Sequence, residues 1–207
     1  MDLFLSKYKT YDFVIPVFHG RYGEDGQITA FLDTLGCKVA YSPFMVHALC
    51  MDKNSTNLLV AQFRVKIPES YFSKKGETLS EKAWDFPLIV KPNRGWSSIA
   101  TSRVKNLEEL SEACDMISDD DILIQKCIEG REFTVWVYHD ASGYHSLPIM
   151  EVVTRDGVLF DYHEKYETDG YNEIFSDLET TLKKSLETQS EYIAKILKRI
   201  TMVGAVF

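Results

Sequence analysis

The feature that most constrains the fold is a short apolar run ending in a lysine and a proline, Leu-Ile-Val-Lys-Pro at 88–92. Such a run is typical of a strand buried on both faces, and proline, which has no N–H to donate, ends it. The turn that follows contains a glycine and two adjacent hydroxyls, Ser97 and Ser98, before a second predicted strand over 99–104. Hydroxyls and backbone N–H groups of such a turn, together with the ammonium of Lys91, can bind a phosphate. An ordinary hairpin whose lysine points to solvent is the alternative that these residues leave open.

Composition limits the classes of protein. The 207 residues, 45% of them hydrophobic, suffice for one or two packed domains. The net charge of -8 disfavours nucleic acid and anionic membranes as partners, although a few local lysines suffice for one triphosphate. No apolar run approaches the ~20 residues of a membrane span, and the amino terminus lacks the pattern of a signal peptide. The four cysteines are scattered, so we expect a cytoplasmic protein with reduced, buried thiols and no zinc site.

The first 41 residues have the pattern of a partial open α/β layer. An apolar run over 12–18 predicts a buried strand, a glycine-rich loop follows, and apolar spacing over 27–35 predicts a helix that ends at Gly36. Ligands of such layers bind where strands end, which places His19 and Glu24 at the mouth of a crevice. The alternative is that both are turn residues bonded to the backbone.

The next segment leads to the central hairpin. Ser42 and Pro43 fit the N-cap and first position of a helix that runs through Met51 and ends at Lys53. A cation at a helix C-terminus is favourable, so Lys53 has a purely structural interpretation. Further predictions are a short helix over 58–63, a strand over 65–68 and a polar linker over 73–81.

The second half predicts one more helix and then mostly strands. Asn106 and Glu109 resemble a capping box at the start of a helix. The side chains of this helix predicted to face the core are Leu107, Leu110 and Cys114. The three aspartates at 119–121 fit a solvated turn and not a calcium site. An antiparallel meander is predicted from strands over 122–128, 133–138, 147–153 and 158–162, followed by a polar loop to 177, a helix over 182–200 and the start of a buried strand at 203–207. Since a complete domain rarely ends inside a strand, we expect the chain to be incomplete.

In order along the chain, five motifs resemble those of the D-alanine–D-alanine ligases, which belong to the ATP-grasp superfamily. They are His-Gly-x-x-Gly-Glu-Asp-Gly at 19–26, Met-Asp-Lys at 51–53, Ile-Val-Lys-Pro with the two serines at 89–98, Ile-Leu-Ile with Gly-x-Glu-Phe-Thr-Val at 122–135, and Phe-Asp-Tyr-x-x-Lys-Tyr at 160–166. The resemblance implies an α/β (α+β) ATP-grasp fold, with two sheet-containing lobes around a nucleotide cleft. The implied divisions are a partial N-terminal segment at 1–41, a central lobe at 42–128 and an incomplete C-terminal lobe at 129–207.

The resemblance also implies roles for individual residues. The implied ATP-binding residues are Lys53, Lys91, Ser97, Ser98, Gln125, Lys126, Ile128, Glu132 and Lys165. Of these, the lysines bind phosphates, the residues at 125–128 present backbone groups to adenine, and Glu132 binds the ribose. Implied catalytic residues are Ser97, Lys165 and Tyr166, and implied substrate contacts are His19, Glu24 and Ser97.

The implied reaction joins two D-alanines through an acyl phosphate, at the expense of ATP, for peptidoglycan precursor synthesis. Tyr166 stands where relatives that use D-lactate commonly have histidine, which favours a dipeptide product. Mg²⁺ is the implied metal, with its ligands expected beyond Phe207 and none in this sequence. The partners are then small molecules, ATP and D-alanine, with a homodimer as a further expectation. The alternatives are an ATP-binding remnant without ligase activity and an ATP-grasp ligase for other amino acids.

Overall fold

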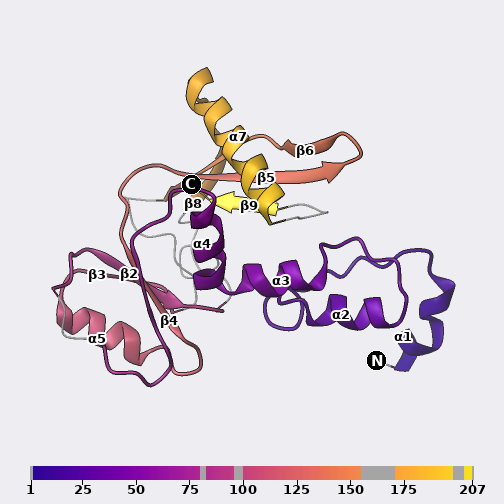
Figure 1. Ribbon diagram of the computed structural model, residues 1–207, viewed down its shortest axis with the longest axis horizontal. Helices are drawn as coiled ribbons and strands as arrows, with labels where there is room; N and C mark the ends of the chain where they lie inside the picture. The colour runs from indigo at the N-terminus through magenta and orange to yellow at the C-terminus, as the bar shows by residue number, and fades with distance from the viewer. Residues whose placement is uncertain (1, 80–82, 96–99, 155–170, 198–202, 207) are drawn as a thin grey trace.

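The computed structural model describes residues 2–79, 83–95, 100–154, 171–197 and 203–206 (Figure 1). The helices are α1 (Asp2–Lys7), the 3-10 turn η1 (Tyr8–Thr10), α2 (Gln27–Thr34), α3 (Phe44–Met51), α4 (Lys53–Gln62), α5 (Leu107–Asp115) and α7 (Thr180–Ile196). The strands are β1 (Ser70–Ser73), β2 (Leu88–Pro92), β3 (Ser102–Val104), β4 (Ile122–Lys126), β5 (Glu132–Asp140), β6 (Gly143–Ser146), β7 (Met150–Thr154), β8 (Tyr171–Phe175) and β9 (Val203–Val206).

The first sheet is antiparallel, with strand order β1-β4-β2-β3, and α5 covers one of its faces (Figure 1). Because side chains alternate along a strand, Leu88 and Val90 face α5 and join Leu110 in the core. Ile89 and Lys91 face the other side and are only partly buried. The prediction of a strand buried on both faces is therefore wrong for β2, because α5 covers one face only. The predicted hairpin itself is confirmed by the β2–β3 pairing.

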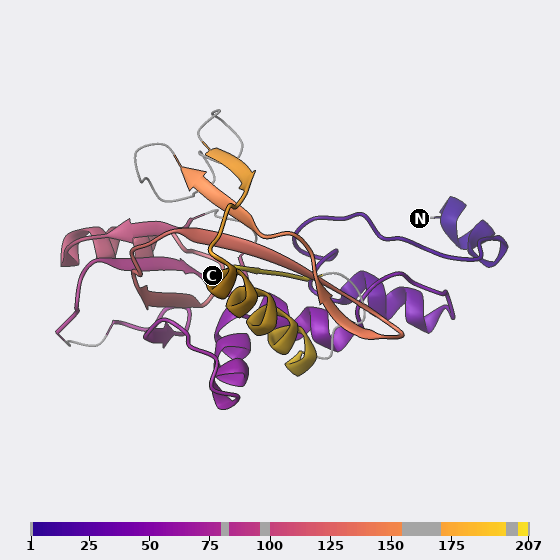
Figure 2. The same cartoon turned by 90° about the horizontal axis from the view of Figure 1, so that it is seen from above.

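The second sheet is built around β5, whose nine residues pair with three other strands. The chain turns after Asp140 and returns along β5 first as β6 and then as β7. The register shifts by one residue between these two strands, which is a β-bulge in the returning chain. Strand β9 pairs with β5, β8 pairs with β7, and α7 lies across the sheet, as Figure 2 shows. The antiparallel pairing predicted for the second half is confirmed, and the strand predicted at 203–207 is present over 203–206. The single meander predicted from residue 122 onward is wrong, because the strand at 122–126 pairs with β1 and β2 of the first sheet.

The amino-terminal helices α1 to α3 extend to one side of the two sheets (Figures 1 and 2). The predicted helix after the glycine-rich loop is confirmed as α2, with Gly36 at a positive φ just after it. The predicted strand over 12–18 is wrong, because only Val14 pairs, in an isolated parallel bridge with Val39. Neighbouring apolar side chains are exposed, at 66% for Ile15 and 80% for Val17. A strand requires a ladder of partners, and the described residues provide one bridge.

Two helix boundaries differ from the prediction. Pro43 is the N-cap of α3 and not its first residue, and α3 ends at Met51. Lys53 does not end that helix but begins α4, because the Asp52 side chain accepts a hydrogen bond from Ser55 N–H and caps a new helix. In α5 the Asn106 cap is confirmed by the bond from Glu109 N–H, at 2.9 Å, but Leu107 is 64% exposed and does not face inward.

Two predictions about strands also fail. Residues 65–68 form no strand, because the ladder with β4 begins only at Ser70 and Pro68 has no N–H to contribute. The predicted polar loop contains β8, in which Tyr171, Ile174 and Phe175 provide β-formers for pairing with β7. The strand predicted over 158–162 lies outside the described residues. All four cysteines are free, but each is only partly buried, whereas buried thiols were expected. In the described part of the chain, no helix has both the length and the apolar character to cross a bilayer.

Candidate functional site

The face of the first sheet opposite α5 carries the polar groups that the sequence singled out. Lys91 pairs with Leu123 across the ladder, and Ile89 pairs with Gln125, so these side chains share one face. Gln125 is only 5% exposed, and its Nε2 donates a hydrogen bond of 2.9 Å to Ser70 Oγ. Burial of an amide is tolerable because it has this partner.

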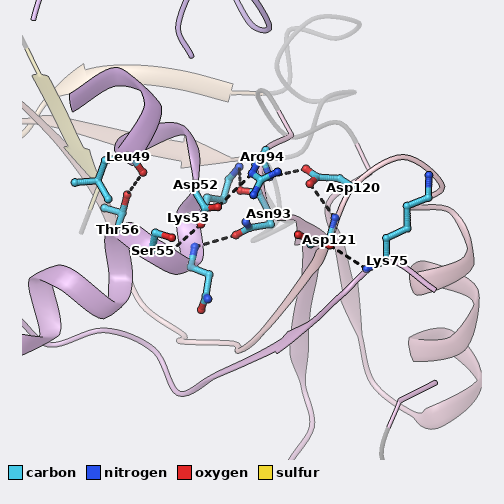
Figure 3. Close-up of polar contacts among 11 residues, drawn as sticks. Leu49, Asp52, Lys53, Ser55, Thr56, Lys75, Asn93, Arg94, Asp120 and Asp121 are labelled. Atoms are coloured by element: carbon cyan, nitrogen blue, oxygen red, sulfur yellow. Dashed lines mark hydrogen bonds and ion pairs between the residues drawn. The ribbon is translucent and has the colours of Figure 1, made fainter. Parts of the chain in front are cut away.

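Lys53 approaches the end of β2 from the amino end of α4 (Figure 3). Its ammonium donates to the carbonyl of Gly95 at 2.6 Å and to that of Asn93 at 3.3 Å. The pKa of Lys53 is lowered from 10.5 to about 8, mainly by burial and next by the charge of Lys91. The carboxylates of Asp120 and Asp52 raise the pKa in part. Lys53 thus carries a charge that is incompletely compensated.

Lys91 connects this position to the second sheet. Burial lowers the pKa of the Lys91 ammonium, and the carboxylate of Glu132, at the start of β5, opposes that shift. Such an electrostatic effect requires that the two groups lie near one another. Glu132, which alternates with the buried Phe133 along β5, belongs to the face of the second sheet directed away from α7. Lys91 is therefore close enough to interact electrostatically both with Lys53, from α4, and with Glu132, from the second sheet.

The turn after β2 brings the backbone close to Lys53, and one glycine makes this possible. A Cβ on Gly95 would lie 2.6 Å from the Cβ of Pro92, which is closer than side chains approach. The glycine thus lets the turn fold back over Pro92 and expose its carbonyl to the Lys53 ammonium. The serines that follow, Ser97 and Ser98, lie outside the described residues, as do Lys165 and Tyr166.

The other residues of the 125–128 segment face elsewhere. The Lys126 ammonium contacts Asp85 Oδ2 at 2.5 Å and the Asp85 carbonyl at 2.9 Å, away from Lys91. Its backbone N–H donates to Glu69 O at 2.8 Å. Ile128 is 70% exposed, at the start of the connection between the two sheets. Their assigned roles concern backbone groups and stay predictions.

His19 and Glu24 lie together in the glycine-rich loop. The Oε2 of Glu24 accepts a hydrogen bond of 2.7 Å from Gly20 N–H, and His19 Nδ1 lies 4.0 Å from Glu24 Oε1. Glu24 therefore organises the loop backbone. A cavity of about 670 Å³ lies beside this loop, and its lining includes Arg21, Asp25, Arg94 and Gly95. Neither His19 nor Glu24 is among the described residues that line it.

The sequence did not reveal a set of residues around Lys53, namely Asp52, Asn93, Arg94, Asp120 and Asp121 (Figure 3). The aspartates at 120 and 121 accept bonds from the backbone N–H groups of Arg94 and Lys75, at 2.5 and 2.9 Å. Asp120 holds the turn after β2 and Asp121 holds the segment after β1, so these residues are not merely a solvated turn. One signal was available: an aspartate three residues before Ser55 fits an N-cap.

No three His, Cys, Asp or Glu side chains in the described parts of the chain group in a way that suits a metal ion. None of the described residues is therefore assigned to Mg²⁺.

The two antiparallel sheets, each covered by a helix, with lysines and an acid between them, define an ATP-grasp protein. The family model described as the D-Ala-D-Ala ligase C-terminus matches residues 54–206, and the chain belongs to the D-alanine–D-alanine ligase family. The chain is 32% identical to the D-alanine–D-alanine ligase of Aquifex aeolicus over 208 residues, 95% of this chain and 69% of that protein.

Other relatives agree. The ligase of Bacillus anthracis is also 32% identical, over 96% of this chain and 65% of its own length. A crystal structure of the Bacillus anthracis ligase complexed with ATP superimposes with a TM-score of 0.81 at 26% identity, over 98% of this chain and 65% of that one. The chain thus spans about two thirds of the length of these relatives.

Proposed function

We propose that this chain binds ATP between its two sheets and takes part in joining two D-alanines, through an acyl phosphate, for peptidoglycan precursor synthesis. The observation that carries the proposal is the approach of Lys53 and Lys91, from different elements, to a site that also contains Glu132. Two half-buried ammoniums with lowered pKa values favour an anionic ligand, because an anion compensates their charges. Transfer of a phosphoryl group spreads negative charge over oxygens, which such lysines stabilise.

The proposed roles follow from the family, and the positions of Lys53, Lys91 and Glu132 give additional support for theirs. Lys53 and Lys91 bind the phosphates, Glu132 binds the ribose, and the segment of Gln125, Lys126 and Ile128 borders the adenine. Ser97, Ser98, Lys165 and Tyr166 are proposed for the reacting phosphate and for closure of the site, and His19 and Glu24 for the first D-alanine. The proposed division stays 1–41, 42–128 and 129–207, with the site between the last two parts.

Magnesium, a cytoplasmic location and a homodimer belong to this proposal as well. Mg²⁺ prefers oxygen ligands and near-octahedral geometry, and binds substrate phosphates in many ATP-using sites. It is supplied with ATP in the assays below, and no residue of this chain is given a role towards it.

The deciding experiment measures phosphate release by the purified chain with ATP, Mg²⁺ and D-alanine. D-alanine-dependent release supports ligation, whereas ATP binding without release favours the second candidate, a nucleotide-binding protein without ligase activity. Release with a different amino acid, and not with D-alanine, identifies a ligase of other substrates.

Substitution of Lys91 tests the site independently of turnover. ATP raises the melting temperature of a protein that binds it in the folded state. We expect Lys91→Ala to lose most of this shift, because it removes a cation directed at the phosphates. Lys105→Ala is the matched control, since this lysine follows β3 and its side chain is exposed. An equal ATP shift in the wild type and in Lys91→Ala contradicts the assignment.

A further inference from the structure

We infer that Asn93 is a positioning residue: it docks the amino end of α4 onto the turn after β2 and thereby fixes the Lys53 ammonium relative to Lys91. The structural part of this inference stands on hydrogen bonds alone. Its consequence for ATP rests on the function proposed above.

Asn93 caps α4 from a distant part of the chain (Figure 3). Its carbonyl accepts from Lys53 N–H at 3.1 Å, and its Oδ1 accepts from Asn54 N–H at 2.9 Å. The next N–H, that of Ser55, is bonded to Asp52 Oδ1 at 2.8 Å. The first N–H groups of a helix have no partners within it, so Asn93 satisfies two of these donors and Asp52 a third. Asn93 thus joins the first two N–H groups of α4 to the turn after β2.

Asn93 is itself held rigidly. It is 0% exposed, and its own N–H donates to Asp121 O at 2.8 Å. The adjacent Arg94 is held on both sides, by its N–H to Asp120 and by its Nε to Asp52 Oδ2 at 3.2 Å. The turn therefore has fixed contacts with α4 on one side and with the aspartates before β4 on the other. A residue in this position transmits the position of the sheet to the helix.

Lys53 needs such support because its location is unfavourable for a cation. The amino end of a helix carries partial positive charge, and the charge of Lys91 adds to it. The Lys53 ammonium is kept there by the carbonyls of Asn93 and Gly95, both in the turn that Asn93 anchors. If α4 separates from the turn, the ammonium loses both carbonyls and moves into water.

The test compares Asn93→Ala with Asn106→Ala in the full chain. Asn106 makes the same kind of bond to α5, from Glu109 N–H at 2.9 Å, on the side of the first sheet away from Lys91. Both variants lose one asparagine cap, so a general loss of stability affects them alike. Two quantities are measured: the titration midpoint of Lys53, by NMR of labelled lysine, and the affinity for ATP, by calorimetry.

In Asn93→Ala we expect the Lys53 midpoint to rise from about 8 towards 10.5, because the ammonium regains water. We expect ATP affinity to fall roughly tenfold, the scale of one lost cap interaction. In Asn106→Ala both quantities stay at their wild-type values. A Lys53 midpoint that is the same in the two variants overturns the inference. If the wild type binds no ATP while the midpoint still moves in Asn93→Ala, the positioning stands and the proposed function fails.

A second variant covers the case in which Asn93→Ala does not fold. Asn93→Asp retains an acceptor oxygen at the same place. Hydrogen exchange of the Asn54 amide then reports the docking directly. Protection of this amide in both the wild type and Asn93→Asp supports the inference, and rapid exchange in the folded wild type overturns it.

Discussion

Lys53 shows how the position of one residue changes its interpretation. At a helix C-terminus its charge would have stabilised the helix, and that structural alternative is wrong because Lys53 begins α4. At the amino end, beside Lys91, the charge is unfavourable in the absence of an anion. A cation kept at an unfavourable place supports the phosphate-binding role proposed for Lys53.

The pKa of Lys53 predicts opposite pH effects on ATP affinity and on stability. ATP affinity should fall as pH rises through about 8, because the free protein then loses the proton from Lys53. The folded-state pKa is below the usual 10.5, so the unfolded chain binds the proton more tightly in this range. As the pH increases from about 8 to 10.5, the contribution of Lys53 to the free energy of unfolding therefore increases. Calorimetry with ATP and urea unfolding across this range measure both effects.

Lys53→Met is the control for this prediction, because it keeps the length of the side chain and removes the titrating group. The fall in ATP affinity near pH 8 should be absent in this variant. An unchanged fall would assign the titration to another group.

At the scale of elements, helix α4 combines two caps of different kinds. Asp52 is the local cap. Burial raises the pKa of its carboxyl, but interactions with Ser55, Asn93 and Arg94 outweigh burial, so the pKa is lowered. In the ion pair between Arg94 and Asp52, the arginine side chain is largely exposed. Exposed ion pairs contribute little to the free energy of unfolding. The cap, and not the ion pair, should therefore dominate the contribution of Asp52 to stability.

Two substitutions of Asp52 separate these contributions. Asp52→Ala should lower the free energy of unfolding by about 1 kcal/mol, the usual loss for an N-cap. Asp52→Asn should lose much less, because asparagine also accepts a hydrogen bond from the third residue of a helix. Urea unfolding at neutral pH measures both. Equal losses would show that the negative charge, and not the cap, stabilises this end of α4.

At the scale of the whole molecule, each sheet has its own core. Leu110 of α5 packs with the first sheet, and Leu186 of α7 packs with the second. The two clusters share no residue in the described part of the chain. A site between two separately stabilised layers can open without exposing either core, which suits a protein that must admit and release a nucleotide.

Matched substitutions in the two cores test this independence. Leu110→Ala and Leu186→Ala each remove a buried leucine and should cost about 2–5 kcal/mol. Hydrogen exchange should accelerate mainly in β2 and β4 for the first variant and mainly in β5 for the second. Equal acceleration of all three strands in either variant would show that the sheets unfold as one unit.

The sequence by itself determined the features that depend on neighbouring residues. The apolar run that becomes β2, the Asn106 cap and the spacing that becomes α2 act within one element, so their signals are local. The motifs likewise indicated the ATP-grasp family before any coordinates, and the family model confirms it.

The tertiary structure alone decided which elements meet. The apolar run at 12–18 and the segment at 65–68 have β-formers but no continuous partner strand, and strand formation depends on that distant partner. Lys53 and Asn93 are far apart in sequence and are joined by hydrogen bonds between elements, and Glu132, from the second sheet, interacts electrostatically with Lys91. Local patterns specify what an element is, whereas long-range pairing and docking decide whether it forms and what its side chains face.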